Sequence, residues 1–317
     1  MNLSSKAGAA GLSVASNIFL SLLKMTAGLV TGSVSVLSEG INSLVDLFAS
    51  LIAFFSIRIA GHPADDEHPF GHGKAENISG AVEGVLIFIG AGIVIYQAIR
   101  KLMFGVTIQM VDLGLVVMFL SVIVDIVVSR HLHRVARMTD SLALEADGDH
   151  LSTDVYTSGG VLVGLALIRI GLLFGIEQAA ILDPVIALLV SFLILRTAYR
   201  ITRKSFGGLV DTRLPREEEE TIRKSIMEHG RELVGFHALR TRKAGGERHI
   251  DLHLEMAKSV SLEEAHRICD HLEKDIEEKL SHTSVIIHCE PCHSECRQCA
   301  VMCAERDGSP GQAGPRP

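Results

Sequence analysis

Long apolar segments dominate the first 200 residues of the chain and place the strongest constraint on its fold. Each segment matches or exceeds the roughly 20 helical residues that cross the ~30 Å hydrocarbon core of a membrane. Because lipid offers no hydrogen bonds to the backbone, a segment that spans a membrane in this way has to be helical. We therefore predict six transmembrane helices, near residues 10–31, 35–60, 78–101, 111–133, 147–173 and 179–201.

Charge is distributed unevenly between the two ends of the chain. The whole chain is 48% hydrophobic, with a mean hydropathy of +0.33, yet residues 211–290 are dense in charged side chains. This asymmetry predicts a transmembrane domain over residues 1–208 and a soluble domain over residues 209–291.

A net charge of −7 argues against a nucleic-acid partner, which would require a basic surface. Small residues at 7–10 precede the first apolar segment instead of following it, so we expect that segment to be retained and not cleaved as a signal.

Basic residues indicate the orientation of the predicted bundle. The links at residues 31–33 and 173–178 contain neither Lys nor Arg, whereas most basic residues near the membrane fall on the other side. The positive-inside rule places that basic side, with both termini, in the cytoplasm, as expected for a multi-pass protein of the inner membrane. Arg100 and Lys101 are a minority on the opposite side. The basic side contains Lys6, Arg58, Lys74, Arg130, Arg134, Arg137, Arg200, Arg203 and Lys204.

Two polar pairs with the same spacing lie inside apolar segments. His150 and Asp154 are four residues apart, so a helix places both on one face. Asn42 and Asp46 repeat this spacing in the second segment, which would run antiparallel to the fifth. Ionisable groups at such positions usually mark an ion path, and four ligands suit a tetrahedral metal site. The alternatives are a structural His–Asp hydrogen bond and, for Asn42, an amide that packs helices together.

A polar, turn-rich loop separates the second and third apolar segments. It contains Asp65, His68 and His72, whose residue types and close spacing are those of a small metal site. A plain turn is the alternative interpretation.

Two further acids, Glu83 and Asp125, lie in the middle of predicted transmembrane helices. Buried acids of this kind line an ion path or pair with a polar partner such as Lys24. The sequence supports both interpretations equally.

The soluble domain shows a mixed helix and strand pattern. The predicted elements are a helix over 216–229, strands over 234–242 and 248–256, a helix from the Ser261 capping box to about Leu280, and a strand over 285–289. In the second strand, apolar residues from Ile250 to Met256 alternate with His249, Asp251, His253 and Glu255. Such a strand has one apolar face and one polar face suited to metal binding. The order αββαβ predicts a small open α/β sandwich.

All six cysteines lie in the last third of the chain, and five of them fall within residues 289–303. Because the cytosol keeps thiols reduced, metal binding is favoured over a disulfide framework. Residues 292–317 form a Cys-rich tail that ends in a Gly/Pro-rich stretch, which we expect to be disordered. Metal capture for delivery and the absence of any role both remain open for its cysteines, Cys292, Cys296, Cys299 and Cys303.

Taken together, these motifs resemble those of the cation diffusion facilitators, six-helix proton-coupled exporters of divalent metals, and most closely the bacterial zinc/iron type. The likeness extends over about residues 10–291, and its most specific part is His-Pro-Phe-Gly-His-Gly-Lys-Ala-Glu combined with His-x-x-x-Asp. The matching stretches are residues 43–46, 65–76, 150–154, 239–242, 253–256 and 286–288.

The resemblance implies a six-helix membrane domain, a ferredoxin-like or metallochaperone-like cytoplasmic domain and a homodimer. It also implies an ion pair between Lys74 and Asp211 that joins the two subunits beneath the membrane. The metal sites that it implies are a transport site at Asn42, Asp46, His150 and Asp154, a loop site at Asp65, His68 and His72, and a cytoplasmic cluster at His237, His253, His266, His288 and Glu290.

Two of these positions depart from the family pattern. Asn42 stands where close relatives usually have Asp or His, and Glu290 stands where they usually have Asp. A neutral amide binds zinc more weakly than a carboxylate and removes one negative charge from the transport site. The sequence therefore does not determine the identity of the metal. Zn²⁺ is the first candidate, Fe²⁺ or Mn²⁺ come next, and Co²⁺ or Cd²⁺ follow.

The residue types at the transport site predict proton-coupled export. Asp46 and Asp154 would cancel the charge of a divalent cation, which cannot otherwise enter a low-dielectric interior. The imidazole of His150 favours zinc, iron or cobalt over magnesium or calcium, and protons compete with metal for its lone pairs. The alternative function is a non-transporting, membrane-anchored metal sensor or scaffold that acts through the cytoplasmic domain. An enzyme is not expected, because the sequence has no His-Glu-x-x-His helix and no nucleophile paired with a base.

Overall fold

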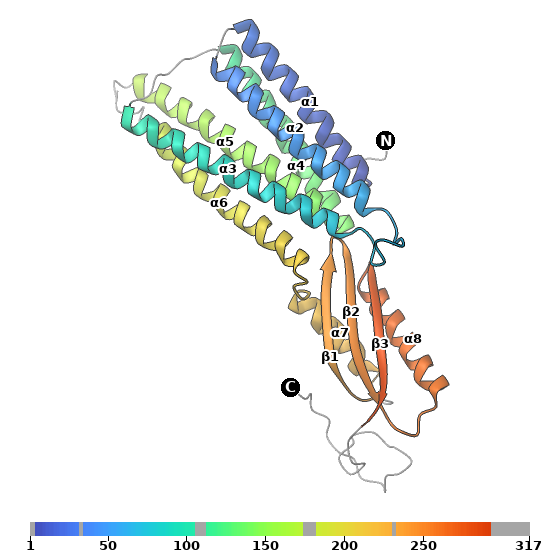
Figure 1. The fold of residues 1–317 in the computed structure, drawn as a ribbon. Helices are drawn as coiled ribbons and strands as arrows, with labels where there is room; N and C mark the ends of the chain where they lie inside the picture. Colours follow the sequence, from blue (N-terminus) through green and yellow to red (C-terminus); the bar gives the residue numbers. More distant parts are fainter. Residues whose placement is uncertain (1–3, 32–33, 105–111, 174–181, 230–232, 293–317) are drawn as a thin grey trace. The chain divides into compact units, whose positions relative to one another are not determined.

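The structure is a computed structural model that describes residues 4–31, 34–104, 112–173, 182–229 and 233–292. The chain divides into two compact units, Met1–Leu209 and Val210–Pro317. Among the described residues, the secondary structure of the first unit consists of helices, whereas the second unit contains both helices and strands (Figure 1). The predicted disordered tail lies outside the described residues from residue 293 onward.

The described part of the first unit contains six long helices. They contain 26 to 32 residues each. At 1.5 Å per residue, such helices are about 39 to 48 Å long and exceed the thickness of the hydrocarbon core. Their bounds are α1 (Lys6–Thr31), α2 (Val34–Ala60), α3 (Lys74–Phe104), α4 (Asp112–Thr139), α5 (Leu142–Leu173) and α6 (Leu182–Leu209).

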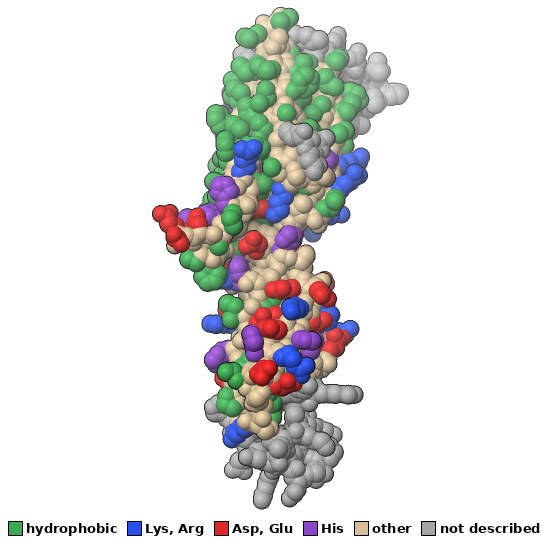
Figure 2. Space-filling view, turned by 90° about the vertical axis from the view of Figure 1, so that its right-hand side faces the viewer, with side chains coloured by type: hydrophobic (Ala, Val, Ile, Leu, Met, Phe, Trp, Pro, Cys, Tyr) green, Lys and Arg blue, Asp and Glu red, His purple; other side chains and the backbone are tan. Residues whose placement is uncertain are grey.

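Five of these helices, α1 to α4 and α6, are long and apolar enough to cross a membrane. Large apolar side chains such as Phe19, Phe48 and Phe119 are more than half exposed on their outer faces, as expected for surfaces that contact lipid. Hydrophobic side chains cover most of the visible face of this unit (Figure 2). The remaining predicted span falls on α5, whose side chains from residue 164 onward lie outside the described part, so that span stays a prediction.

Small residues allow α3 and α6 to pack closely. Gly80 and Gly84 lie one turn apart on α3 and face Ser205 and Thr202 of α6. A Cβ atom at position 80 would lie 2.5 Å from the Ser205 hydroxyl oxygen, closer than van der Waals contact allows. Contact of this kind is typical of helices in membranes, which associate through close packing of small residues.

The second unit is a three-stranded sheet with two helices. Its elements are α7 (Arg216–Glu228), β1 (Leu233–Ala244), β2 (Glu247–Met256), α8 (Leu262–Lys279) and β3 (Thr283–Pro291). The strand order is β1-β2-β3, with β1 antiparallel and β3 parallel to β2. The predicted fold class is confirmed, and the strands begin or end within a few residues of the predicted bounds.

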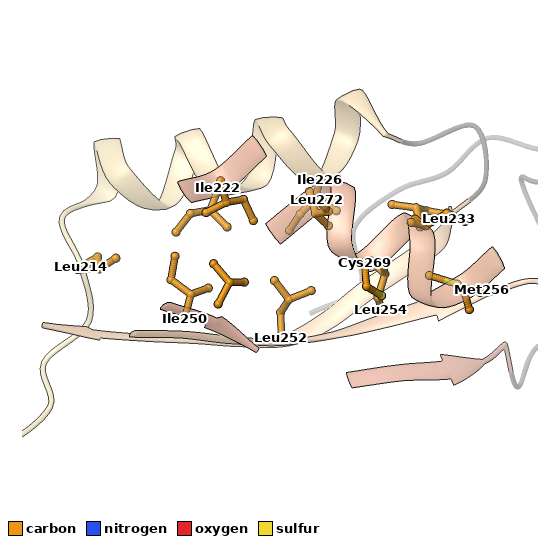
Figure 3. Packing of buried hydrophobic residues seen from close by; sticks show 14 residues of the cluster. Leu214, Ile222, Ile226, Leu233, Ile250, Leu252, Leu254, Met256, Cys269 and Leu272 are labelled. Carbon is orange, nitrogen blue, oxygen red and sulfur yellow. The ribbon is translucent and has the colours of Figure 1, made fainter. Parts of the chain in front are cut away.

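The core of this unit lies between the helices and one face of the sheet (Figure 3). Ile222 of α7 and Leu272 of α8 are fully buried against the apolar side of β2, to which Ile250 and Leu254 contribute. Because side chains alternate along a strand, the polar residues of β2 lie on the opposite face. The predicted helix start is confirmed, with Ser261 as the N-cap, since Ser261 Oγ accepts a hydrogen bond from the backbone N–H of Glu264 at 3.2 Å.

Candidate metal sites

A cluster of one imidazole and two carboxylates lies between α2 and α5. His150 Nε2 lies 3.2 Å from Asp46 Oδ1 and 3.9 Å from Asp154 Oδ2. One ligand atom from each of the three residues lies within 4.8 Å of the other two. His150 and Asp154 share a face because they are one helical turn apart, and Asp46 reaches them from the facing helix. We refer to these three residues as the membrane cluster.

The two ring nitrogens of His150 have different surroundings in the membrane cluster. Within the described residues, His150 Nδ1 is buried without a hydrogen-bond partner, so Nε2 is the atom that faces both carboxylates. Asn42, the predicted fourth ligand, lies one turn before Asp46 on α2 with an exposed side chain. Its role as a ligand stays a prediction.

Further buried polar side chains surround the membrane cluster. Lys24 of α1 is buried, and its ammonium donates a 2.9 Å hydrogen bond to the hydroxyl of Ser43 on α2. Asp125 on α4 and Glu83 on α3 are also buried, as their positions in apolar segments predicted. Both carboxylate oxygens of Glu83 lack a hydrogen-bond partner among the described residues.

Asp149 is a buried acid that the sequence analysis did not single out. Its Oδ1 atom lies 3.1 Å from His133 Nε2 on α4, and its Oδ2 atom accepts a 2.7 Å hydrogen bond from Arg200 on α6. His133 Nδ1 lies 2.8 Å from the carbonyl oxygen of Ser129, so both ring nitrogens face acceptors, an arrangement that suits a doubly protonated ring. Consecutive helical residues point about 100° apart, which turns Asp149 away from the cluster that contains His150. Its position in an otherwise apolar segment was the available signal.

The loop between α2 and α3 brings its three predicted ligands together. Asp65 Oδ1 lies 3.2 Å from His68 Nδ1, and Asp65 Oδ2 lies 3.5 Å from His72 Nε2. The backbone N–H of His68 donates a 2.6 Å hydrogen bond to the same carboxylate and lowers the pKa of Asp65. Gly71, with a φ of 74°, supplies the left-handed turn that precedes His72.

Three histidines form a row across the sheet of the second unit. The strand register pairs His237 of β1 with His253 of β2, and His253 with His288 of β3. Neighbouring ring centroids are 5.0 Å and 4.7 Å apart. Glu290 lies on the same side of β3 as His288, two residues further on, and accepts a short hydrogen bond from His237 Nε2. We call these four residues the sheet cluster.

Two features suit the sheet cluster to a cation. Ligand atoms of His237, His253 and Glu290 lie within 4.8 Å of one another, and His253 Nδ1 is buried without a hydrogen-bond partner among the described residues. The hydrogen bond from His237 lowers the pKa of Glu290, which keeps the carboxylate charged. A β-bulge after His237, with Ala238 at a φ of 51°, shifts the strand register at this point.

The structure departs from the predicted ligand set of the sheet cluster at two residues, Glu255 and His266. Glu255 was not predicted as a ligand, although its Oε1 atom lies 3.8 Å from His237 Nε2. His266 is on α8, where it is exposed and lies 3.6 Å from Asp270. The described contacts do not place His266 with the other four predicted ligands, and its membership stays a prediction.

The predicted Lys74–Asp211 pair has one residue in each unit. Lys74 Nζ donates to the carbonyl oxygen of Leu209 at 3.5 Å, and Asp211 accepts a 3.3 Å hydrogen bond from Arg242. The pairing between the two subunits therefore remains a prediction.

Apolar membrane-type helices with a His–carboxylate cluster between them, together with an αββαβ domain that carries a second one, are the features of a multi-pass membrane protein with candidate cation sites. Residues 11–210 match the model of the cation efflux transmembrane domain, and residues 214–292 match that of the cation efflux protein cytoplasmic domain. The chain belongs to the cation efflux family, a family of transporters.

Two sequence relatives agree with this assignment, and one solved structure is similar to part of the chain. The chain is 36% identical over 269 residues to an uncharacterised transporter of Synechocystis, covering 85% of each chain. It is 35% identical over 288 residues to the cation-efflux pump FieF of Escherichia coli, covering 91% of this chain and 93% of the pump. A solved structure of CzrB in its zinc form is 40% identical and covers 26% of this chain and 92% of that one, with a TM-score of 0.24.

Proposed function

We propose that the protein exports divalent metal cations from the cytoplasm in exchange for protons, and that the membrane cluster is its transport site. The observation that carries the proposal is the meeting of Asp46, His150 and Asp154 between two long helices of the membrane domain. Groups of this kind are rare inside membranes and mark ion paths. The relationship to cation-efflux pumps supports the outward direction.

The composition of the membrane cluster suits a divalent transition metal. Two carboxylates supply two negative charges, which balance the charge of the ion in a low-dielectric site. An imidazole nitrogen favours zinc, iron or cobalt over magnesium and calcium. Zn²⁺ is therefore the first candidate, with Fe²⁺ or Mn²⁺ next and Co²⁺ or Cd²⁺ behind them.

Coupling to protons follows from competition at one atom. His150 Nε2 faces both carboxylates, so this nitrogen can hold either a proton shared with Asp46 or a metal ion shared with all three residues. A site that opens toward a more acidic exterior would exchange metal for protons, and a site that opens toward the cytoplasm would do the reverse. Alternating access then produces antiport.

The remaining parts of the proposal concern assembly and location. We propose a homodimer in the inner membrane with both termini in the cytoplasm. The sheet cluster would bind metal near the subunit interface, and Lys74 would pair with Asp211. We propose that the loop site captures metal from solvent, which the exposure of Asp65 and His68 supports.

Flux through purified protein tests the transport function. The protein is reconstituted into proteoliposomes with a pH gradient, and uptake of Zn²⁺, Fe²⁺, Mn²⁺, Co²⁺ and Cd²⁺ is measured together with proton movement. We expect at least one of these metals to drive proton flux, and Asp154→Asn to abolish the flux. Glu67→Gln, which changes an exposed acid, is the control and should retain it. Metal binding without proton flux in the wild type would instead favour the sensor or scaffold function.

A further inference from the structure

Two cysteines of the second unit face each other across its core. Cys269 Sγ on α8 lies 2.6 Å from Cys289 Sγ on β3, and both are free thiols. Cys269 is 5% exposed, and Cys289 is half-buried. Figure 3 shows Cys269 in the packed layer between α8 and the sheet, near Leu254.

This geometry suits a covalent bond better than a shared metal ion. Two thiolates bound to zinc at about 2.3 Å in a tetrahedral site would lie roughly 3.8 Å apart. The two sulfur atoms are much closer than that, and their spacing approaches the ~2.05 Å of a disulfide. In the described part of the chain, no third ligand forms a metal-binding group with these two cysteines.

We propose that Cys269 and Cys289 form a reversible disulfide that joins α8 to β3 under oxidising conditions. The bond would close a loop of 20 residues between two elements of the same unit. Cys289 lies between His288 and Glu290, whose side chains point to the opposite face of the strand. The disulfide would therefore secure, from the core side, the strand that provides two members of the sheet cluster.

A small-molecule disulfide such as oxidised glutathione is the electron acceptor. The Cys289 thiolate attacks one sulfur of this disulfide, which forms a mixed disulfide and releases one thiolate. The Cys269 thiolate then attacks the Cys289 sulfur and expels the second thiolate. The two cysteine protons end on the two released thiols, and the two electrons reduce the small-molecule disulfide.

The different environments of the two thiols determine the order of attack. Burial and the neighbouring Cys289 raise the pKa of the Cys269 thiol, so its thiolate is scarce. Cys289 is more exposed and therefore accessible to the oxidant first. A reducing cytosol keeps the pair as thiols, and the bond forms when oxidised small-molecule disulfide accumulates.

Disulfide mapping of the full-length protein tests this proposal. Cys296, Cys299 and Cys303 are replaced by Ser, and the protein in detergent is treated with oxidised glutathione, alkylated, digested and analysed by mass spectrometry. We expect a peptide pair that links Cys269 to Cys289. We also expect the unfolding temperature to rise by several degrees and to return to its original value after reduction.

Adding Cys269→Ser supplies the matched control. Cys289 should then remain as a mixed disulfide with glutathione, and the unfolding temperature should not rise. The proposal would be overturned by a Cys289–Cys292 link in the folded protein. A second outcome would also overturn it. If the protein is treated with excess oxidant and then unfolded, and Cys269 still reacts completely with the alkylating reagent, no disulfide has formed at Cys269. Both outcomes are independent of metal transport.

Discussion

Lys6 Nζ lies 3.0 Å from Glu76 Oε1, which joins the beginning of α1 to the beginning of α3. The other oxygen of Glu76 accepts hydrogen bonds from the Ser141 hydroxyl at 2.7 Å and from the backbone N–H of Ala143 at 3.4 Å, where α5 begins. Glu76 is only 1% exposed. One buried carboxylate thus connects the N-terminal ends of three helices in the membrane domain.

We expect Glu76→Gln to destabilise the membrane domain. The substitution preserves size but leaves Lys6 and the buried Ser141 facing a neutral amide. Removing one member of a fully buried ion pair costs about 3–5 kcal/mol, and because the Lys6 side chain is 33% exposed we expect a smaller loss here. The unfolding temperature in detergent should fall by several degrees. Glu67→Gln, at an exposed position in the loop, should leave it unchanged. Equal unfolding temperatures for Glu76→Gln and wild type would show that this junction contributes nothing to stability.

A second prediction compares two acids of α5. Asp149 is buried between His133 and Arg200, whereas Glu145 pairs with Lys204 at 2.5 Å in a half-exposed position. We expect Asp149→Asn to destabilise the protein more than Glu145→Gln does, because it leaves His133 and Arg200 facing a neutral amide in place of a buried carboxylate. Glu145→Gln should cost less than about 1 kcal/mol, since exposed ion pairs contribute little. Denaturant or thermal unfolding of both variants measures the difference, and equal losses would contradict this assignment.

Much of the fold and part of the candidate sites follow from local patterns in the sequence. The period-two alternation from His249 to Met256 predicts a strand with one polar face, and the structure has that strand. The four-residue spacing of His150 and Asp154 predicts a shared helix face, because helical periodicity alone determines it. Patterns of this kind are readable because they depend only on residues that are close in sequence.

Contacts between distant segments could not be derived in the same way. Asp149 finds its partners 16 and 51 residues away, and nothing near it in the sequence specifies them. Cys269 and Cys289 were separated in the sequence analysis, which grouped the cysteines by proximity along the chain and missed the partner on α8. The bulge at Ala238 likewise depends on strand pairing, not on the local residues.

Asn42→Asp tests the fourth position of the transport site. If Asn42 contributes a ligand, a carboxylate at this position adds a negative charge and a stronger zinc ligand. We expect the ratio of Zn²⁺ to Mn²⁺ uptake in proteoliposomes to change several-fold. Asn42→Ala is the companion variant, and it should reduce uptake without adding charge. Unchanged selectivity in Asn42→Asp would exclude Asn42 as a ligand.

His253 occupies the centre of the sheet cluster, with His237 on one side and His288 on the other. We expect His253→Ala to weaken zinc binding there by at least about 10-fold, since losing even an outer-shell partner of a metal has effects of that size. Chelator competition measures the affinity in an Asp154→Asn background, which disables the membrane cluster.

The same assay tests whether His266 is a metal ligand of the sheet cluster. Because its side chain is exposed and lies beside Asp270, we expect His266→Ala to lose less affinity than His253→Ala. His271→Ala, at another exposed position of α8, is the control and should bind as the parent protein does. A loss in His266→Ala that equals the loss in His253→Ala would instead confirm His266 as a ligand.

The low pKa of Glu290 predicts how the sheet cluster responds to acid. The hydrogen bond from His237 lowers this pKa. The carboxylate therefore stays charged at pH values where an ordinary glutamate would begin to take up a proton, and it loses its charge only as the pH falls through the lowered pKa. Between about pH 8 and about pH 5, protons that displace zinc should therefore not bind to Glu290. Calorimetry in buffers of different ionisation enthalpy counts these protons. We expect Glu290→Gln to weaken zinc binding while the number of protons taken up on release stays the same, and a smaller number would show that Glu290 itself titrates in this range.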